Sequence, residues 1–81
     1  MTIATAASLR IKNLLKERNM TPYRLEQRSG VLHGTMSSIL NGENNDIKLG
    51  TIMKIAKGFD MTFMEFLNDP LFLSDELEYE Y

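Results

Sequence analysis

The chain of 81 residues has no cysteine, no tryptophan and only one histidine. Disulfide bonds and thiolate metal sites are therefore excluded, and a single imidazole cannot form a cluster of metal ligands. Apolar packing has to hold the fold, although a chain this short buries only about 60–65% of its extended surface on folding. We expect one small domain with no metal and no other cofactor.

Long hydrophobic runs are also missing. No apolar run comes near the roughly 20 residues that span a bilayer, and residues 1–9 lack the basic flank and the apolar stretch of a secretory signal. Hydrophobic residues make up 43% of the chain and charged residues 25%, which is ordinary for a soluble globular domain. We expect a cytoplasmic protein that has no membrane partner.

Basic residues are absent from the end of the chain. All nine lysines and arginines lie in residues 1–68, beside six of the eleven acidic residues. This part carries a net charge of about +3, against −2 for the whole chain, and such local basic surface leaves binding to nucleic acid open. The other acidic residues form an extension at residues 69–81: Asp69, Asp75, Glu76, Glu78 and Glu80.

Apolar residues at helical spacing predict a first helix at about residues 5–19. Arg10 and the other charged residues are expected on its remaining faces. The predicted buried stripe consists of Ala7, Ile11, Leu14 and Leu15. A second helix is expected from Pro22 to about Ser29, because Thr21 supplies a hydroxyl N-cap and proline is tolerated at the first helical position. Gly30 ends it, since glycine adopts positive φ without steric cost.

A third helix is predicted between Leu32 and Asn41, and its apolar and polar residues lie on different faces. The expected buried stripe consists of Leu32, Met36, Ile39 and Leu40. The expected polar face consists of His33, Gly34, Ser37, Ser38 and Asn41. The residues that follow Gly42 read as a polar loop of turn-forming residues.

Two more helices are predicted before the acidic extension. A fourth covers about Leu49–Phe59 and turns Lys54 and Lys57 outward. Its expected inward residues are Leu49, Ile52, Ile55, Ala56 and Phe59. A fifth covers residues 62–68, where Thr62 and Glu65 form a capping box. Its expected buried residues are Phe63, Phe66 and Leu67. Pro70 stops this helix by disfavouring the helical conformation in Asp69.

Two short helices joined by a turn that contains glycine, here at residues 21–42, are typical of a helix-turn-helix. Many helical hairpins share this spacing, so periodicity alone leaves DNA binding undecided. The residues themselves resemble the Cro/repressor (XRE) family in three segments: Thr21–Val31 with Thr35–Gly42, Leu49–Lys57 and Thr62–Leu67. The resemblance implies an all-α, five-helix, lambda-repressor-like DNA-binding domain at residues 1–68.

The resemblance also implies which residues contact DNA. Base contacts are expected from the start of the third helix: His33, Gly34, Thr35, Ser37 and Ser38. Phosphate contacts are expected from Thr21, Tyr23, Asn41, Asn44, Asn45 and Lys48. Arg24 and Arg28 either supply charge to this surface or are simply solvated, and the sequence leaves both readings open.

Several residues depart from the family pattern. Leu15 and Leu40 stand where many relatives bury an arginine–glutamate pair, and such a paired apolar replacement is often neutral or stabilising. The other departures remove a phosphate-contacting side chain, a helix cap or a basic residue, or add a charge beside the turn. In that order they are Pro22, Leu32, Glu43 and Glu26. They predict modest affinity for DNA and a protein that needs two subunits to bind.

The main functional hypothesis is a repressor that binds a palindromic operator as a homodimer. An antitoxin that regulates its own operon, and a protein-interaction module on the same scaffold, remain as alternatives. The extension at residues 69–81 either covers the edge of the fifth helix, builds the dimer interface, binds a protein partner or is disordered. We expect no enzyme, because a lone histidine on a convex helix has neither a pocket nor an orienting carboxylate.

Overall fold

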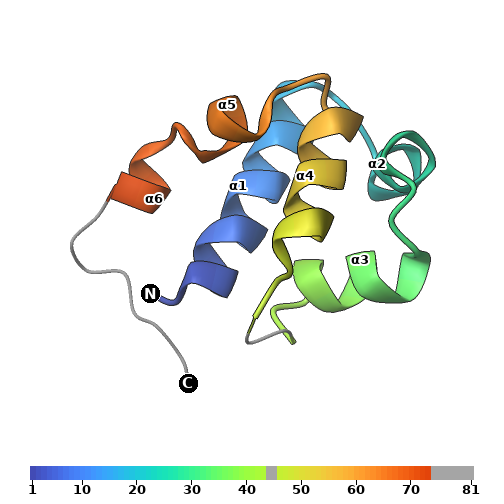
Figure 1. Ribbon diagram of the computed structural model, residues 1–81. Coiled ribbons are helices and arrows are strands. Elements are labelled where there is room, and N and C mark those ends of the chain that lie inside the picture. Colours follow the sequence, from blue (N-terminus) through green and yellow to red (C-terminus); the bar gives the residue numbers. More distant parts are fainter. Residues whose placement is uncertain (44–45, 74–81) are drawn as a thin grey trace.

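Six helices follow one another in the computed structural model, which describes residues 1–43 and 46–73 of the chain (Figure 1). They are α1 (Ile3–Glu17), α2 (Pro22–Ser29), α3 (His33–Leu40), α4 (Leu49–Gly58), α5 (Phe63–Leu67) and α6 (Pro70–Leu73). The all-α fold class is confirmed, and α6 adds a short helix to the five that were expected. None of the helices in the described residues is long and apolar enough to cross a membrane.

Helix α1 begins two residues earlier than expected because Thr2 caps it. The Thr2 hydroxyl accepts a hydrogen bond from the backbone N–H of Thr5 at 3.1 Å, which satisfies one of the free donors of the first turn. The predicted stripe is confirmed, since all four of its residues are buried: Ala7, Ile11, Leu14 and Leu15.

Arg10 was expected on an exposed face of α1, and this expectation is wrong. Its Nε donates to the carbonyl oxygen of Phe66 at 2.8 Å, and Nη2 donates to that of Glu65 at 3.1 Å. Its Nη1 donates to the carboxylate of Asp69 at 3.0 Å, and only 8% of the residue is exposed. The last carbonyls of a helix have no partner inside it, so a guanidinium with several donors can hold the end of α5 against α1.

The core lies between the helices. It takes residues from α1 to α5, together with Val31 in the turn after α2 and Phe59 directly after α4. Its largest fully buried side chains are Phe59, Phe66, Ile11, Leu25, Met36, Ile39 and Ile55. Helices α2 and α4 approach closely at Gly58, where an added Cβ would lie 2.9 Å from Cβ of Ser29. Arg28 crosses the same contact, because its Nε donates to the carbonyl oxygen of Gly58 at 2.8 Å. Helix α2 is therefore fixed to α4 by close packing and by a hydrogen bond.

Two leucines that were expected in the core are exposed instead. Leu32 is 78% exposed and Leu49 is 70% exposed. Leu32 is the N-cap of α3 with an extended backbone (φ −65°, ψ 149°), so its side chain does not follow the spacing of the helix. Leu49 is the first residue of α4, where no preceding turn fixes its side chain over the core.

The other predictions for α3, α4 and α5 largely hold. Met36 and Ile39 are buried, and Leu40 packs against the core from a half-buried position. In α4 the remaining inward residues are buried as expected: Ile52, Ile55, Ala56 and Phe59. The capping box of α5 is confirmed in both directions, with Thr62 and Glu65 bonded to each other's backbone N–H. Phe66 is fully buried, whereas Phe63 and Leu67 are half-buried.

The start of the acidic extension folds back as α6. Figure 1 shows α6 on the opposite side of the molecule from α2 and α3. Phe72 packs against the core, with its ring centroid 6.0 Å from that of Phe66, while Leu73 remains 71% exposed. Phe72 therefore covers the edge of α5, one of the roles considered for this segment. Residues 74–81 lie outside the described part of the chain, and the domain boundary at residue 68 stays a prediction.

Candidate nucleic-acid interface

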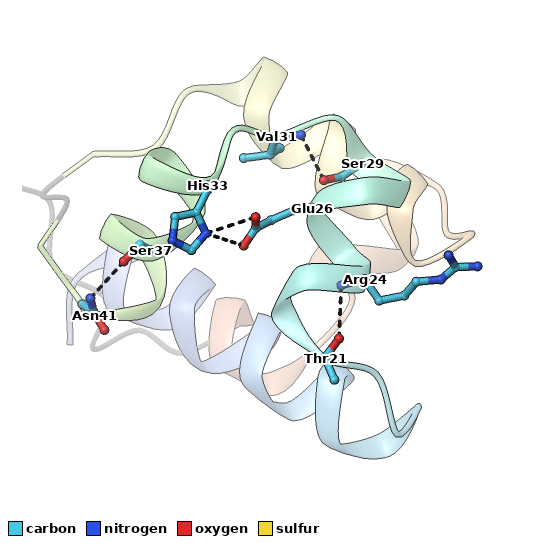
Figure 2. A network of polar contacts seen from close by, with 8 residues as sticks. All are labelled: Thr21, Arg24, Glu26, Ser29, Val31, His33, Ser37 and Asn41. Carbon is cyan, nitrogen blue, oxygen red and sulfur yellow. Dashed lines mark hydrogen bonds and ion pairs between the residues drawn. The ribbon is translucent and has the colours of Figure 1, made fainter.

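The start of α2 and the turn after it have the geometry that the sequence predicted. The Thr21 hydroxyl accepts a hydrogen bond from the backbone N–H of Arg24 at 3.1 Å (Figure 2). Gly30 adopts the left-handed conformation at φ 77°, and its N–H donates to the Glu26 carbonyl at 2.9 Å. Val31 then turns into the core, and its N–H donates to Oγ of Ser29 at 3.2 Å. These bonds fix the angle at which α3 leaves α2.

The predicted base-contacting residues form the outer face of α3, since none of them is fully buried, whereas Met36 and Ile39 are. Three of them are exposed, namely His33, Gly34 and Thr35, and two are half-buried, namely Ser37 and Ser38. Nothing lies within 4 Å of the position that a Cβ on Gly34 would occupy. The outer face of α3 is therefore open, neutral and built from short side chains that donate and accept hydrogen bonds.

The predicted phosphate-contacting residues border this face. Asn41 caps the end of α3, and its Nδ2 donates to Oγ of Ser37 at 3.3 Å (Figure 2). Lys48 is exposed at the start of α4 and lines a surface depression together with Thr35. On α2, Tyr23 is 67% exposed, and its hydroxyl accepts a hydrogen bond from Nε2 of Gln27 at 3.1 Å. The predicted Asn44 and Asn45 lie outside the described residues.

The two arginines of α2 have different surroundings. Arg24 is exposed, and Figure 2 shows its side chain extending away from the helix. The guanidinium of Arg28 bonds to the backbone of Gly58 in α4, so this side chain has a structural role. Arg24 is therefore the residue of the two that is available to a phosphate group.

Two features of this surface were not predicted as parts of the site. Leu32 places an exposed apolar side chain directly before α3, where a thymine methyl group would be a suitable partner. The carboxylate of Glu26 contacts the imidazole of His33, with Nδ1 at 3.1 Å from both Oε1 and Oε2 (Figure 2). The expectation that no carboxylate orients the histidine is therefore wrong. The contact spans the turn between α2 and α3, and helical spacing within either helix gives no sign of it.

Comparison with protein families gives an independent result for the same region. A family model described as a Cro/C1-type HTH DNA-binding domain matches residues 10–70 of the chain. The match runs from within α1 to the start of α6 and contains the whole surface described above. No curated protein and no solved structure matches the chain in the corresponding comparisons. The match agrees with the resemblance drawn from the residues of the helix-turn-helix.

Proposed function

Because the chain belongs to the Cro/C1-type family of helix-turn-helix DNA-binding domains, we propose that it is a transcriptional repressor that reads a palindromic operator with α3 in the major groove. DNA binding and a role in regulating transcription follow from the family. The observation that carries the finer proposal is the open outer face of α3, which places His33, Thr35 and Ser38 at the surface. Families with this domain are generally not enzymes.

The side chains on α3 suit direct reading of base edges. Thr35, Ser37 and Ser38 have hydroxyl groups that both donate and accept, so they fit several edges at short range. Gly34 has no side chain and would let the helix approach the DNA closely. Leu32 extends the same surface with an apolar group for a thymine methyl. This neutral face favours specificity over raw electrostatic attraction.

Phosphate groups would be held by the residues that border α3. Thr21, Tyr23, Asn41 and Lys48 surround it on two sides, and Asn44 and Asn45 are proposed for the same role from the sequence. The start of α2 adds the positive end of the helix dipole, which is favourable for an anion. Such contacts set the position of the protein on DNA without reading its sequence.

Homodimer formation is proposed at the opposite end of the domain. Met64 of α5 and Leu73 of α6 are each 71% exposed, and both line an apolar depression that includes Leu67 and Phe72. Exposed apolar side chains that gather around a depression favour contact with another protein surface. In a symmetric dimer the two copies of α3 would enter successive major grooves about 34 Å apart.

Selection of binding sites from random duplex DNA tests the repressor proposal. We expect an enriched, two-fold symmetric sequence whose affinity falls steeply as salt rises. His33→Ala and Ser38→Ala should each lose discrimination at one base position, whereas Lys12→Ala on the exposed face of α1 should leave the preferred sequence unchanged. Absence of any enriched sequence would contradict the proposal.

Sedimentation of a Leu73→Glu variant tests the dimer. We expect the complex of the wild-type chain with its operator to contain two protein subunits for each duplex. The variant should bind as a monomer and with lower affinity. The matched control is Met53→Glu, which makes the same change of charge at an exposed apolar position of α4. Unchanged mass and affinity in Leu73→Glu would place the subunit contact elsewhere.

A further inference from the structure

The contact between Glu26 and His33 joins a shielded carboxylate to an exposed ring. The Glu26 side chain is 13% exposed and the His33 side chain is 83% exposed. In the part of the chain that the structure describes, both hydrogen bonds of the ring are made by Nδ1, which lies 3.1 Å from each carboxylate oxygen. His33 is the first residue of α3, so the rest of its ring stands at the entrance to the proposed base-reading face.

An ionised carboxylate can only accept hydrogen bonds, so the nitrogen that faces it has to carry a proton. With Nδ1 protonated, the neutral imidazole has its lone pair on Nε2, which then acts as an acceptor. In the major groove adenine and cytosine present amino groups that donate, whereas guanine presents only the acceptors N7 and O6. The tautomer of His33 therefore decides which bases it can bind.

We propose that Glu26 is a positioning residue that fixes the proton of His33 on Nδ1 and so directs Nε2 to the amino group of adenine or cytosine. This inference rests on the proposed function, since it assigns a base preference to the same face of α3. A carboxylate so close to the DNA would be repelled by phosphate groups and would lower affinity for every sequence. Its contact with His33 gives Glu26 a role in selecting the base, and this gain in specificity accompanies the loss in general affinity.

Nitrogen-15 spectroscopy of the imidazole tests the tautomer without DNA. The chain has one histidine, so its ring signals need no further assignment. At about pH 8, above the range in which histidines ordinarily take up a second proton, we expect Nδ1 to be protonated and Nε2 to be free. Glu26→Gln should populate the other tautomer, because an amide can donate to Nδ1 as well as accept from it. A wild-type ring protonated on Nε2 would overturn the proposal.

Selection from random duplexes at the same pH tests the base preference. We expect adenine or cytosine at the position that His33→Ala relaxes, with discrimination against guanine of about tenfold. Glu26→Gln and Glu26→Ala should relax the same position, and the His33→Ala/Glu26→Ala double variant should be no worse there than His33→Ala alone. Enrichment of adenine or of cytosine distinguishes the two amino-bearing bases.

Glu43→Gln is the matched control, because it removes a carboxylate from an exposed position after α3 that does not contact His33. It should raise affinity for all duplexes alike and leave the base preference unchanged. If the Glu26 variants behave in the same uniform way while His33→Ala changes a base position, the positioning role is overturned and the proposed function stands. If the wild-type chain enriches no sequence, both fail. Thermal unfolding of each variant shows whether it is folded.

Discussion

The two ends of this domain expose different kinds of side chains. The α2–α3 end presents short polar groups such as Thr35 and Ser38 beside an open glycine, whereas the α5–α6 end presents Met64 and Leu73, each 71% exposed. A mostly polar face fits the edges of bases, and an apolar face fits another protein surface. The difference fits the proposal that α3 reads DNA while subunits pair through α5 and α6.

Both ends are nevertheless attached to the core in a similar manner. Arg28 of α2 donates to the carbonyl oxygen of Gly58, and Arg10 of α1 donates to those of Glu65 and Phe66. In each case a guanidinium satisfies carbonyls near the end of a helix, which have no partner within it. Arg10 and Arg28 therefore stabilise the fold, whereas Arg24 remains available to contact DNA. Substitutions can test this division.

Replacing Arg10 by alanine should have the largest effect on stability. It leaves the carboxylate of Asp69 and two carbonyl oxygens without their shared partner, which we expect to cost about 3 kcal/mol of unfolding free energy. Chemical denaturation measures this loss. Arg24→Ala is the control, and it should lower DNA affinity while changing stability by less than about 0.5 kcal/mol. Equal stability losses in the two variants would contradict the division.

Gly58→Ala should disturb the α2–α3 end through packing alone. The added Cβ would meet Ser29 Cβ at 2.9 Å and Leu25 Cδ1 at 3.0 Å, so α2 has to move. We expect a loss of about 2 kcal/mol in stability, together with weaker DNA binding. Thermal unfolding and a binding titration measure the two effects. A variant as stable as the wild type would show that this contact is not tight in solution.

The hydroxyl caps of α2 and α5 allow a matched comparison of the two ends. Thr21 and Thr62 each accept a hydrogen bond from a backbone N–H at 3.1 Å. Thr21→Ala and Thr62→Ala should each cost about 1 kcal/mol in denaturant unfolding. Only Thr21→Ala should also weaken binding to the operator, because Thr21 is the cap proposed to contact phosphate. Loss of affinity in both variants to the same degree would contradict this assignment.

Gly34→Ala should separate stability from binding. The site has no neighbour within 4 Å, and alanine is the better helix former, so we expect a gain of about 0.5 kcal/mol in stability. The same methyl group would stand between α3 and the DNA, and affinity for the operator should fall. Calorimetry and a binding titration give the two values. An unchanged affinity would mean that the DNA does not approach Gly34.

The smallest predicted effect is a change in the pH dependence of stability at α5. The hydrogen bond from the Thr62 backbone N–H, together with the Thr62 side chain, lowers the pKa of Glu65 below its ordinary value. A carboxylate with a lowered pKa stabilises the fold above its unfolded pKa, and this contribution is lost as pH falls through its folded pKa. Glu65→Gln should therefore flatten the acidic limb of the stability profile. An unaltered slope would contradict a role for this carboxylate.

Much of the fold follows from the sequence because its helices carry local signals. Hydroxyl caps at Thr21 and Thr62, the left-handed Gly30 and the apolar spacing of α1 and α4 are each encoded within a few residues. These signals located five helices to within about two residues at their ends. The family could be predicted for the same reason, since the helix-turn-helix pattern lies within one short segment of the sequence.

The errors have long-range or terminal causes. Arg10 is paired with residues more than fifty positions away, and the spacing of apolar residues within one helix cannot predict such a partner. Leu32 is the N-cap of α3 and Leu49 is the first residue of α4, where helical spacing does not determine the direction of the side chain. The Glu26–His33 contact crosses a turn between two helices. Each of these requires the packing of the whole domain to be known.

The most direct test of whether α3 reads DNA is a titration of nitrogen-15-labelled protein with the duplex enriched by selection, followed through backbone chemical shifts. We expect large changes at the outer face of α3, around His33, Thr35 and Ser38, and at the start of α2. Changes confined to α5 and α6, or spread evenly over the domain, would contradict the assignment of α3 as the element that reads DNA.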